Sequence, residues 1–290
     1  MSTNPLLDTT GLPLFDQIKP EHVTPALDVL LADAEAALTK VTGPDVPPDY
    51  HALSLLLDAS TVRLGRAWGA AGLLNSVADT PEIRAAYNEN LPRITEFYTR
   101  LGSDERLYAK YKALNEAQKG LDPERRLSPA RQRALDLALR GFVLGGAELQ
   151  GEAKARFAAI QEEHAAKSQA SSEHVMDATD AYSCYVRADE LAGVPEDVLH
   201  ATRAAAEAEG KEGHKLTLHM PCYLPVMQYA SNRALRETMY RAYATRASEF
   251  GPEERDNTAL MSDLLALRQE EARLLGYTNY AEVSLVPKMA

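Results

Sequence analysis

The 290-residue chain has little sulfur, few aromatic residues and no excess of positive charge. Its two cysteines, Cys184 and Cys222, cannot build the disulfide framework that holds small secreted domains together. Lysine and arginine number 31 against 42 aspartates and glutamates, which gives a net charge of -11. Because nucleic acids and anionic membranes reward basic patches, the composition argues against both as partners.

Several familiar sequence signals are also missing. No apolar run approaches the length that spans a bilayer, and the first residues lack the basic and apolar segments of a secretory signal. The chain has no Gly-rich phosphate loop, no GxSxG motif and no plausible Cys–His nucleophile pair. We therefore expect a cytoplasmic globular protein with no nucleic acid or membrane partner.

What the chain does have is helical periodicity. Apolar residues recur at three- and four-residue spacing along most of its length, which predicts amphipathic helices. In the segment 50–75, Gly65, Gly69 and Gly72 favour the close approach of a neighbouring helix, and Trp68 among them is predicted to lie in the core. The predicted buried positions of this helix are Leu53, Leu56, Leu57, Val62, Leu64, Ala67, Leu73 and Leu74.

Two segments alternate between apolar and polar residues instead, which is typical of strands. They are about 182–187, with Tyr182, Cys184 and Val186, and about 215–220. We expect the two segments to pair. The predicted fold is mainly α, a multi-helix bundle with a minor two-stranded β-ribbon.

A chain of this length lies beyond the usual size of a single core. The Gly145-Gly146 pair suggests a boundary between an N-terminal helical domain, residues 1–145, and a second helical segment with the ribbon, residues 146–290. Residues 1–19 read as an extended arm that docks on the first domain. Its expected anchors are Leu12, Leu14, Phe15 and Ile18.

The last part of the chain is expected to begin with an extended run between Pro221 and Pro225 and to continue as three helices. The third of these helices begins at Asn279, which forms a capping box with Glu282. Its apolar positions have no later partner in the sequence. We therefore expect either self-association through the C-terminal helices or a disordered tail beyond Gly276.

Several stretches carry a family resemblance. They are NPLL from Asn4, FDQIKPEH from Phe15, YLPVM from Tyr223, RALRETMYRAYATRAS from Arg233 and LLALRQEEARLLGYTNYAEVSL from Leu264. Together they resemble the oligopeptidase A and thimet oligopeptidase family of zinc metallopeptidases, and the match runs from end to end of the chain.

The resemblance implies a helical shell around a deep channel that admits short cytoplasmic peptides. It covers only about the first half of such an enzyme, and the HExxH zinc motif of the family would follow Ala290. None of the seven histidines stands in an HExxH. The resemblance thus implies an N-terminal region that forms one wall of the channel and is inactive alone. It also implies zinc in a catalytic half outside this chain, so we assign no catalytic, cofactor-binding or metal-binding residue here.

The nearest approach to a zinc ligand set lies on the predicted helix 151–179. His164 and His174 stand ten residues apart, almost three helical turns, so they cannot bind one ion on a straight helix. We interpret them as part of a solvated helix face. The acidic residues beside them are Glu162, Glu163, Glu173 and Asp177.

The remaining candidates have weaker spacing. His214 and His219 are five residues apart and would point to opposite faces of a strand, so we interpret them as turn and surface positions. Cys184 and Cys222 would approach each other if the two strands pair. A redox switch or a soft metal site is conceivable there, but two sulfurs alone hold a metal poorly and cytoplasmic thiols stay reduced, so we expect free thiols.

One aromatic and basic cluster stands out near the C-terminal end. Such a face suits the carboxylate of a peptide in a channel. The alternative, which we favour, is structural: Tyr240 and Tyr243 lie in the core, and the arginines pair with nearby glutamates. The cluster comprises Tyr223, Tyr229, Tyr240, Tyr243, Arg233, Arg236, Arg241 and Arg246, and the glutamates are Glu237, Glu249, Glu253 and Glu254.

Two other functions stay open from the sequence. One is a stand-alone helical module that binds a protein or a peptide without cutting it. The other is an independent metal enzyme that uses the scattered histidines. The sequence does not distinguish a cloned fragment, a truncated gene product and a complete small protein, and it does not give the peptide specificity or the oligomeric state.

Overall fold

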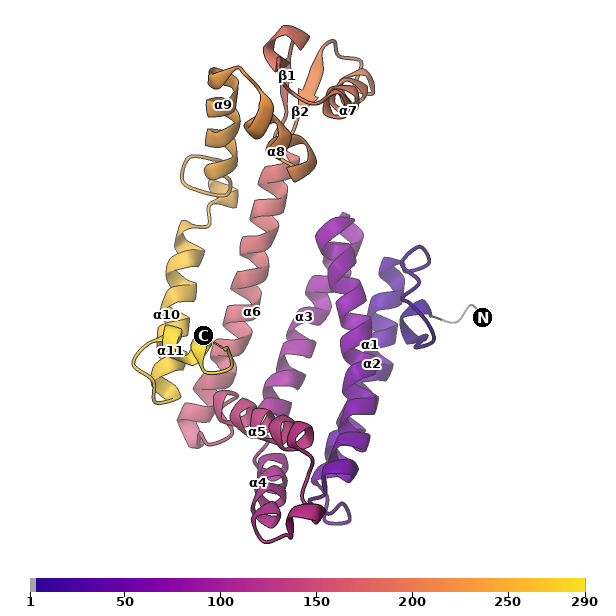
Figure 1. Ribbon diagram of the computed structural model, residues 1–290, viewed down its shortest axis with the longest axis vertical. Helices are drawn as coiled ribbons and strands as arrows, with labels where there is room; N and C mark the ends of the chain where they lie inside the picture. Colours follow the sequence, from indigo (N-terminus) through magenta and orange to yellow (C-terminus); the bar gives the residue numbers. More distant parts are fainter. Residues whose placement is uncertain (1–3, 290) are drawn as a thin grey trace. The chain divides into compact units, whose positions relative to one another are not determined.

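A computed structural model describes residues 4–289 of the chain (Figure 1). The chain divides into two compact units. Unit 1 comprises the residues up to Ala166 together with Leu267 onward, and unit 2 comprises Lys167–Ala266. The predicted mainly α fold with a two-stranded ribbon is confirmed. The predicted domain boundary near Gly145 stays a prediction.

Unit 1 is built from helices with well-defined starts. Thr80 accepts a hydrogen bond from the Ile83 amide and is followed by Pro81, the residue type best suited to a first helical position. The helices are α1 (Pro20–Thr42), α2 (Tyr50–Val77), α3 (Pro81–Gly102), α4 (Glu105–Lys119), α5 (Pro129–Leu144), the first part of α6 (Gly151–Asp180), the end of α10 (Thr258–Leu274) and α11 (Tyr280–Leu285), with short 3-10 helices η1 (Pro5–Leu7) and η2 (Pro123–Arg125).

The core of unit 1 forms where α1 packs along α2 and α3 (Figure 1). Phe97 of α3 is only 1% exposed and lies among leucines and alanines of the other two helices. Burial of each large apolar side chain contributes about 1.5–3 kcal/mol, so this contact region contributes strongly to the stability of the unit. A second apolar cluster joins α1 and α2 to α4 and α5.

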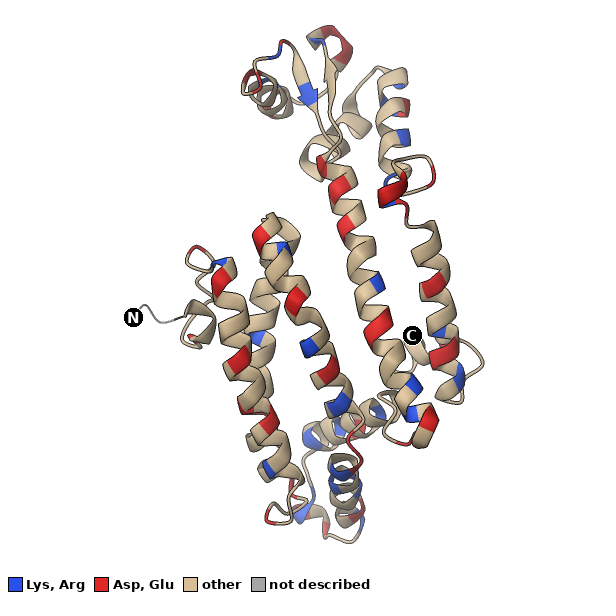
Figure 2. Ribbon diagram, turned by 180° about the vertical axis from the view of Figure 1, so that it is seen from behind, with Lys and Arg blue, Asp and Glu red and all other residues tan. Residues whose placement is uncertain are grey.

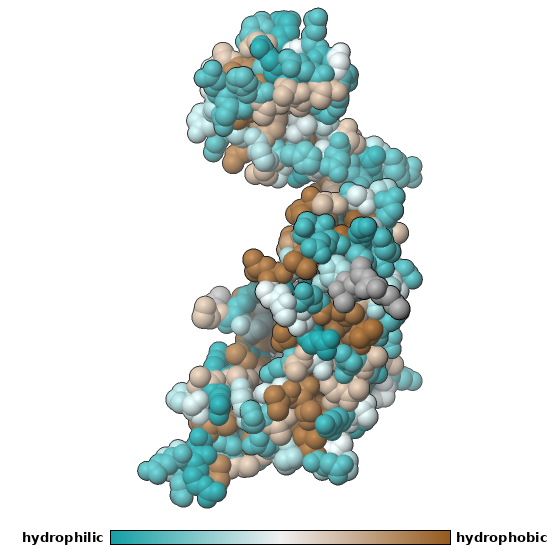
Figure 3. Space-filling view, turned by 90° about the vertical axis from the view of Figure 1, so that its right-hand side faces the viewer, coloured by the Kyte–Doolittle hydropathy of each residue, from teal (hydrophilic) through white to brown (hydrophobic). Residues whose placement is uncertain are grey.

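The outer face of α2 corrects the sequence-based expectation. Val62 is 66% exposed and Leu73 is 46% exposed, although both were expected in the core. They share a face with Leu55, because seven and eleven residues are near whole numbers of helical turns. Trp68 is half-buried at the edge of the core. The apolar pattern of α2 is wider than the surface that its neighbours in unit 1 cover, and Figure 3 shows brown apolar patches on this unit.

The N-terminal arm lies against α1 and α2 through η1. Leu6 is buried in the unit 1 core, and Arg66 of α2 donates a hydrogen bond to the Gly11 carbonyl at 2.6 Å. Two of the expected anchors do not serve as such, because Leu12 is 85% exposed and Phe15 is 38% exposed. Contact with the body is made at both ends of the arm, by η1 at its start and by the expected anchor Ile18, which packs against the unit 1 core, at its end.

Unit 2 contains the ribbon and the helical segments around it. Its elements are the second part of α6, β1 (Cys184–Val186), η3 (Ala188–Leu191), α7 (Glu196–Glu207), β2 (His214–Leu216), α8 (Met220–Tyr229), α9 (Arg233–Ala244), η4 (Glu253–Arg255) and the first part of α10.

The two strands pair antiparallel, with Cys184 opposite Leu216 and Val186 opposite His214. The ribbon is therefore where the alternation predicts it, although each strand is only three residues long. Leu216 is fully buried and packs in the apolar cluster of unit 2. Gly193, in the turn before α7, has a φ of +93°, and a Cβ there would lie 2.3 Å from the Tyr229 carbonyl oxygen. This position requires glycine.

The segment from Met220 to Tyr229 is helical, so the expected extended run and the last residues of the second predicted strand are wrong. Pro221 stands in the first turn, where its missing amide hydrogen costs nothing. Pro225 removes one interior hydrogen bond. Burial of Tyr223 and Val226 offsets that loss, since both side chains pack in the apolar cluster of unit 2.

The C-terminal helix α11 is held by specific contacts. The Asn279 side chain accepts a hydrogen bond from the Glu282 amide, and Val283 is buried. Arg140 of α5 donates to the Val286 carbonyl oxygen at 2.7 Å. A disordered tail beyond Gly276 is therefore wrong for the residues up to 289. Self-association stays a prediction.

Charge is unevenly distributed over the helices. On the ribbon of Figure 2, acidic residues outnumber basic ones along α1 and α6, whereas basic residues outnumber acidic ones on α4 and α5. Within residues 4–289, every helix falls short of the combined length and apolarity that crossing a membrane would need.

Candidate functional site

The most complete candidate site is a pocket in unit 1 of about 390 Å³. Its walls come mainly from α3 and the start of α6, and α2, the end of α5 and α10 close the sides. All of these segments belong to unit 1. We call this cavity the α3–α6 pocket. A mostly apolar concave site with a few polar groups is the usual form of a small-ligand site.

The lining of the α3–α6 pocket is largely apolar and aromatic. Trp68, Tyr98 and Phe157 supply rings, and Leu91 and Ile94 supply aliphatic surface. The Trp68 ring stacks on Tyr87 with centroids 4.2 Å apart, which fixes the orientation of the indole. Burial raises the pKa of the Tyr98 phenol, so this side chain stays neutral and presents a hydroxyl group.

Besides the hydroxyl groups of Thr95, Tyr98 and Thr99, an amide and a carboxylate reach into these apolar surroundings. The Gln161 Nε2 atom is buried and has no acceptor at hydrogen-bonding geometry among the residues described. Glu271 of α10 is the one charged residue in the lining of the α3–α6 pocket. Burial raises the pKa of its carboxyl group, and the neighbouring Gln161 amide and the Arg268 charge act in the opposite direction. The desolvation of Glu271 is thus only partly offset.

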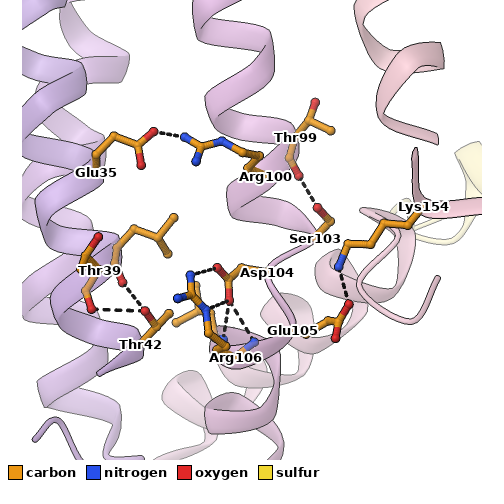
Figure 4. Close-up of polar contacts among 12 residues, drawn as sticks. Glu35, Thr39, Thr42, Thr99, Arg100, Ser103, Asp104, Glu105, Arg106 and Lys154 are labelled. Carbon is orange, nitrogen blue, oxygen red and sulfur yellow. Dashed lines mark hydrogen bonds and ion pairs between the residues drawn. The ribbon is translucent and has the colours of Figure 1, made fainter. Parts of the chain in front are cut away.

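A second pocket in unit 1, of about 460 Å³, is lined by charged side chains. Figure 4 shows how they are paired: Glu35 faces Arg100, Asp104 faces Arg106 and Glu105 faces Lys154. The Arg106–Asp104 and Lys154–Glu105 pairs are each 2.6 Å long. Every cation in the view has a carboxylate partner, so this pocket offers no free charge to a ligand.

A third pocket, of about 300 Å³ in unit 2, contains Cys222. Cys222 lies in the first turn of α8, and its Sγ accepts a hydrogen bond from the Thr217 amide at 3.3 Å. Burial raises the pKa of this thiol, which lowers its reactivity. Cys184 lies on β1, as predicted, and both thiols are free.

The histidines of α6 are structural. His164 Nε2 accepts a hydrogen bond from Arg268 at 3.1 Å, and burial lowers the pKa of this imidazole. His174 Nδ1 lies 2.8 Å from the Asn257 side-chain oxygen. Both rings are half-buried, so the interpretation as a solvated face is wrong. Of the acidic residues beside them, Glu163 pairs with Arg156 at 2.8 Å.

The two histidines near β2 differ from each other. His214 is buried and its Nδ1 lies 3.0 Å from the Thr202 hydroxyl of α7, so it is not a surface position. His219 is exposed, as expected, with Nε2 3.2 Å from Asp180. Among residues 4–289, no three His, Cys, Asp or Glu side chains are grouped so that they could hold one metal ion. A zinc site therefore does not fit the residues described.

Part of the aromatic and basic cluster in unit 2 is structural. Tyr223 and Tyr243 stack with centroids 4.2 Å apart, and the Arg246 guanidinium lies 3.7 Å from the centre of the Tyr243 ring. Arg246 also donates to the Thr179 hydroxyl at 2.7 Å. These three side chains form one stack that joins α6, α8 and α9.

The rest of the cluster contradicts the structural interpretation. Tyr240 is 59% exposed, so it is not a core residue. None of the four arginines forms an ion pair with the predicted glutamates in the part of the chain that the structure describes. Arg236 donates instead to the Ala230 carbonyl oxygen at 3.1 Å. The side chains of α9 thus face solvent more than the spacing indicated.

Comparison with known proteins gives two family-level matches. Residues 27–154 match the model of the neurolysin/thimet oligopeptidase N-terminal domain, and residues 226–290 match the model of peptidase family M3. These two matches agree with the predicted resemblance to the oligopeptidase A and thimet oligopeptidase family. The predicted resemblance is confirmed.

The curated relatives extend this match over the whole chain. Oligopeptidase A of Salmonella typhimurium is 44% identical over 99% of this chain and 42% of its own length. A probable cytosolic oligopeptidase A of Arabidopsis thaliana is 39% identical over all of this chain and 41% of its own length. A dipeptidyl carboxypeptidase of Salmonella typhimurium is 28% identical over all of this chain and 43% of its own length. The chain spans about two fifths of the length of these relatives.

The α3–α6 pocket takes residues from both matched segments. Trp68 and the α3 residues lie within the first matched segment, and Glu271 lies within the second. Sequence reasoning missed this site, although one signal was present. Glu271 falls on the same apolar stripe as Leu264, Leu267 and Leu274, and a carboxylate on a buried stripe is unusual.

Proposed function

We propose that this chain is the N-terminal region of an oligopeptidase A-type zinc metallopeptidase that degrades short peptides in the cytoplasm. It forms one wall of the substrate channel and has no peptidase activity alone. The observation that carries this proposal is the match of almost the whole chain with the N-terminal two fifths of oligopeptidase A.

The residues of this chain support a binding role better than a catalytic one. The histidines of α6 and β2 are engaged in hydrogen bonds with Arg268, Asn257 and Thr202. Zinc and the general base that activates its bound water are therefore proposed to come from sequence outside residues 1–290. The chain itself offers a concave apolar surface with a few polar groups, which suits peptide side chains.

A chimeric enzyme tests the proposal. Residues 1–290 would replace the matching N-terminal part of Salmonella typhimurium oligopeptidase A, and hydrolysis of a short quenched-fluorescence peptide would be measured. We expect the chimera to cleave the peptide and to lose activity with a chelator, whereas residues 1–290 alone cleave nothing. Chelator-sensitive hydrolysis by residues 1–290 alone, with about one zinc per chain, would contradict the proposal and support the independent metal enzyme.

A stand-alone peptide-binding module is the second candidate. The α3–α6 pocket favours it, because its lining is complete within unit 1. The two candidates differ in one result: an inactive chimera whose N-terminal region still binds peptides would favour the module.

A further inference from the structure

The α3–α6 pocket has an unusual charge pattern. Three aromatic and three aliphatic residues line it together with one carboxylate and no cation. Glu271 forms no ion pair among the residues described, while its neighbour Glu270 pairs with Arg156 at 2.7 Å. Of these two consecutive glutamates of α10, Glu270 forms an ion pair with Arg156, whereas Glu271 lines the pocket without an ion pair among the residues described.

We propose that the α3–α6 pocket binds the basic side chain of a peptide, a lysine or an arginine, with the cationic group at Glu271. This inference rests on the proposed function, from which it takes the premise that the ligand is a peptide. It adds the class of side chain that the pocket binds. It assigns Glu271 as a specificity-determining residue.

Geometry supports a long cationic side chain as the occupant. Lysine and arginine carry an aliphatic stem that packs on apolar surface while the charged end reaches a polar partner. Leu91 and Ile94 supply that surface in the pocket, and the Trp68 and Tyr98 rings supply faces that attract cations. The buried Gln161 amide lies beside the carboxylate and lowers its pKa, so it is a neutral polar neighbour of Glu271 and not a counter-ion.

Charge complementarity disfavours acidic and apolar side chains. An acidic side chain would bring a second carboxylate to Glu271 without a cation between them. A neutral apolar side chain would cover the carboxylate and leave it without a partner, which is costly for a desolvated charge. Arg268, the nearest basic side chain on α10, is already held by the His164 ring and the Tyr280 face. A cation from outside is the partner that the site lacks.

The chain carries its own reporter for this test, because Trp68 is its only tryptophan and lines the pocket. Residues 1–290 would be titrated with blocked tripeptides Ala-X-Ala in which X is arginine, lysine, norleucine or glutamate. Trp68 fluorescence and titration calorimetry would both be followed. We expect saturable binding of the arginine and lysine peptides, at least tenfold tighter than norleucine, and none of the glutamate peptide.

Two variants distinguish an effect of the Glu271 charge on binding from an effect of the substitution on folding. Glu271→Gln keeps the side-chain size and removes the charge, and it should weaken the arginine peptide at least tenfold without changing norleucine binding. Glu270→Gln is the matched control on the next residue, outside the pocket, and should leave binding unchanged. In the unsubstituted chain, binding of the arginine peptide should be lost as the pH falls and Glu271 takes up a proton. Because burial raises the pKa of Glu271, this loss should occur at a pH above the usual pKa of a glutamate.

Three results would overturn the inference: equal binding of norleucine and arginine peptides, unchanged arginine binding in Glu271→Gln, or no saturable binding of either basic peptide. Each is distinct from a failure of the proposed function. If the chimera cleaves peptides but the pocket binds arginine and norleucine peptides equally, only this inference is contradicted. Charge-selective binding with an inactive chimera would sink the peptidase proposal alone.

Discussion

Unit 1 and unit 2 hold themselves together in different ways. In unit 1, long helices pack lengthwise, and two apolar clusters supply most of the interior. Unit 2 has one apolar cluster around a three-residue ribbon, and its elements are joined by ring stacking and by bonds to buried histidine and asparagine side chains. The stability of unit 1 thus depends mainly on buried apolar area, and the stability of unit 2 depends on a few specific contacts.

The difference has a practical meaning. Apolar area is roughly additive, so unit 1 should tolerate changes in proportion to the surface that they remove. A buried polar group that loses its partner keeps the full cost of desolvation, so unit 2 should respond sharply at a few positions. Four substitutions test this contrast.

The largest effect is expected in the core of unit 1. Phe97→Ala should reduce the free energy of unfolding by about 3–5 kcal/mol, because it leaves a cavity at a fully buried site. Urea unfolding measures the loss, and hydrogen exchange shows where it acts. Leu55→Ala, on the 63%-exposed outer face of α2, is the control and should change little. Equal losses in the two variants would mean that the core is not where the structure places it.

A smaller loss is expected at the turn before α7. Gly193→Ala should cost at least about 2 kcal/mol, since it combines a left-handed φ with contact against the Tyr229 carbonyl. Gly210→Ala is the matched control: its φ is +68° and nothing lies within 4 Å of the added Cβ. If thermal unfolding gives the same shift for both variants, backbone conformation alone sets the cost.

The buried asparagine of unit 2 comes third. Asn257 donates to the Ser171 carbonyl at 3.0 Å and meets His174 with its side-chain oxygen. Asn257→Ala should cost about 1–3 kcal/mol, because two partners on α6 are left without a hydrogen bond. Urea unfolding of this variant and of His51→Ala, an exposed position, checks the prediction. A loss in both would point to a general effect of the substitutions.

The smallest effect concerns Glu271, the carboxylate in the apolar stripe of unit 1. Its folded pKa is raised above the usual 4.5, so its charge costs stability as the pH rises through that raised value. Glu271→Gln should therefore be more stable than the unsubstituted chain at neutral pH, and the difference should vanish toward acid. Glu270→Gln should show the opposite sign, because Arg156 lowers the pKa of Glu270. Thermal melts at several pH values compare the two; equal signs would contradict the assignment.

The sequence predicted unit 1 better than unit 2. Helical periodicity finds α1 to α5 because their burial repeats with the helix, and alternation finds the ribbon for the corresponding reason. Periodicity failed at α8, where two prolines concealed a helix that the packing of Tyr223 and Val226 stabilises. It also failed at Val62, since a pattern of apolar residues does not say which neighbour covers them.

The candidate site was beyond pattern reasoning for a related reason. Trp68, Gln161 and Glu271 are separated by about one hundred residues each, and only the packing of three helices brings them to one pocket. The histidines, by contrast, attracted notice by residue type alone, yet their nearest partners are an arginine, an asparagine and a threonine. Residue type suggests chemistry, but three-dimensional packing selects which groups meet.

The ribbon has a consequence for how this protein behaves at high concentration. Each of its two strands leaves one edge unpaired, and unpaired edges are templates for aggregation. Here the strands are three residues long and carry charge: Lys215 pairs with Glu209, and Lys211 lies 3.8 Å from the centre of the Tyr185 ring. A foreign strand would gain few hydrogen bonds and would displace these ion contacts. The ribbon is thus poorly suited to seed β-sheet aggregates, even though among the described residues no third strand pairs with either of its outer edges.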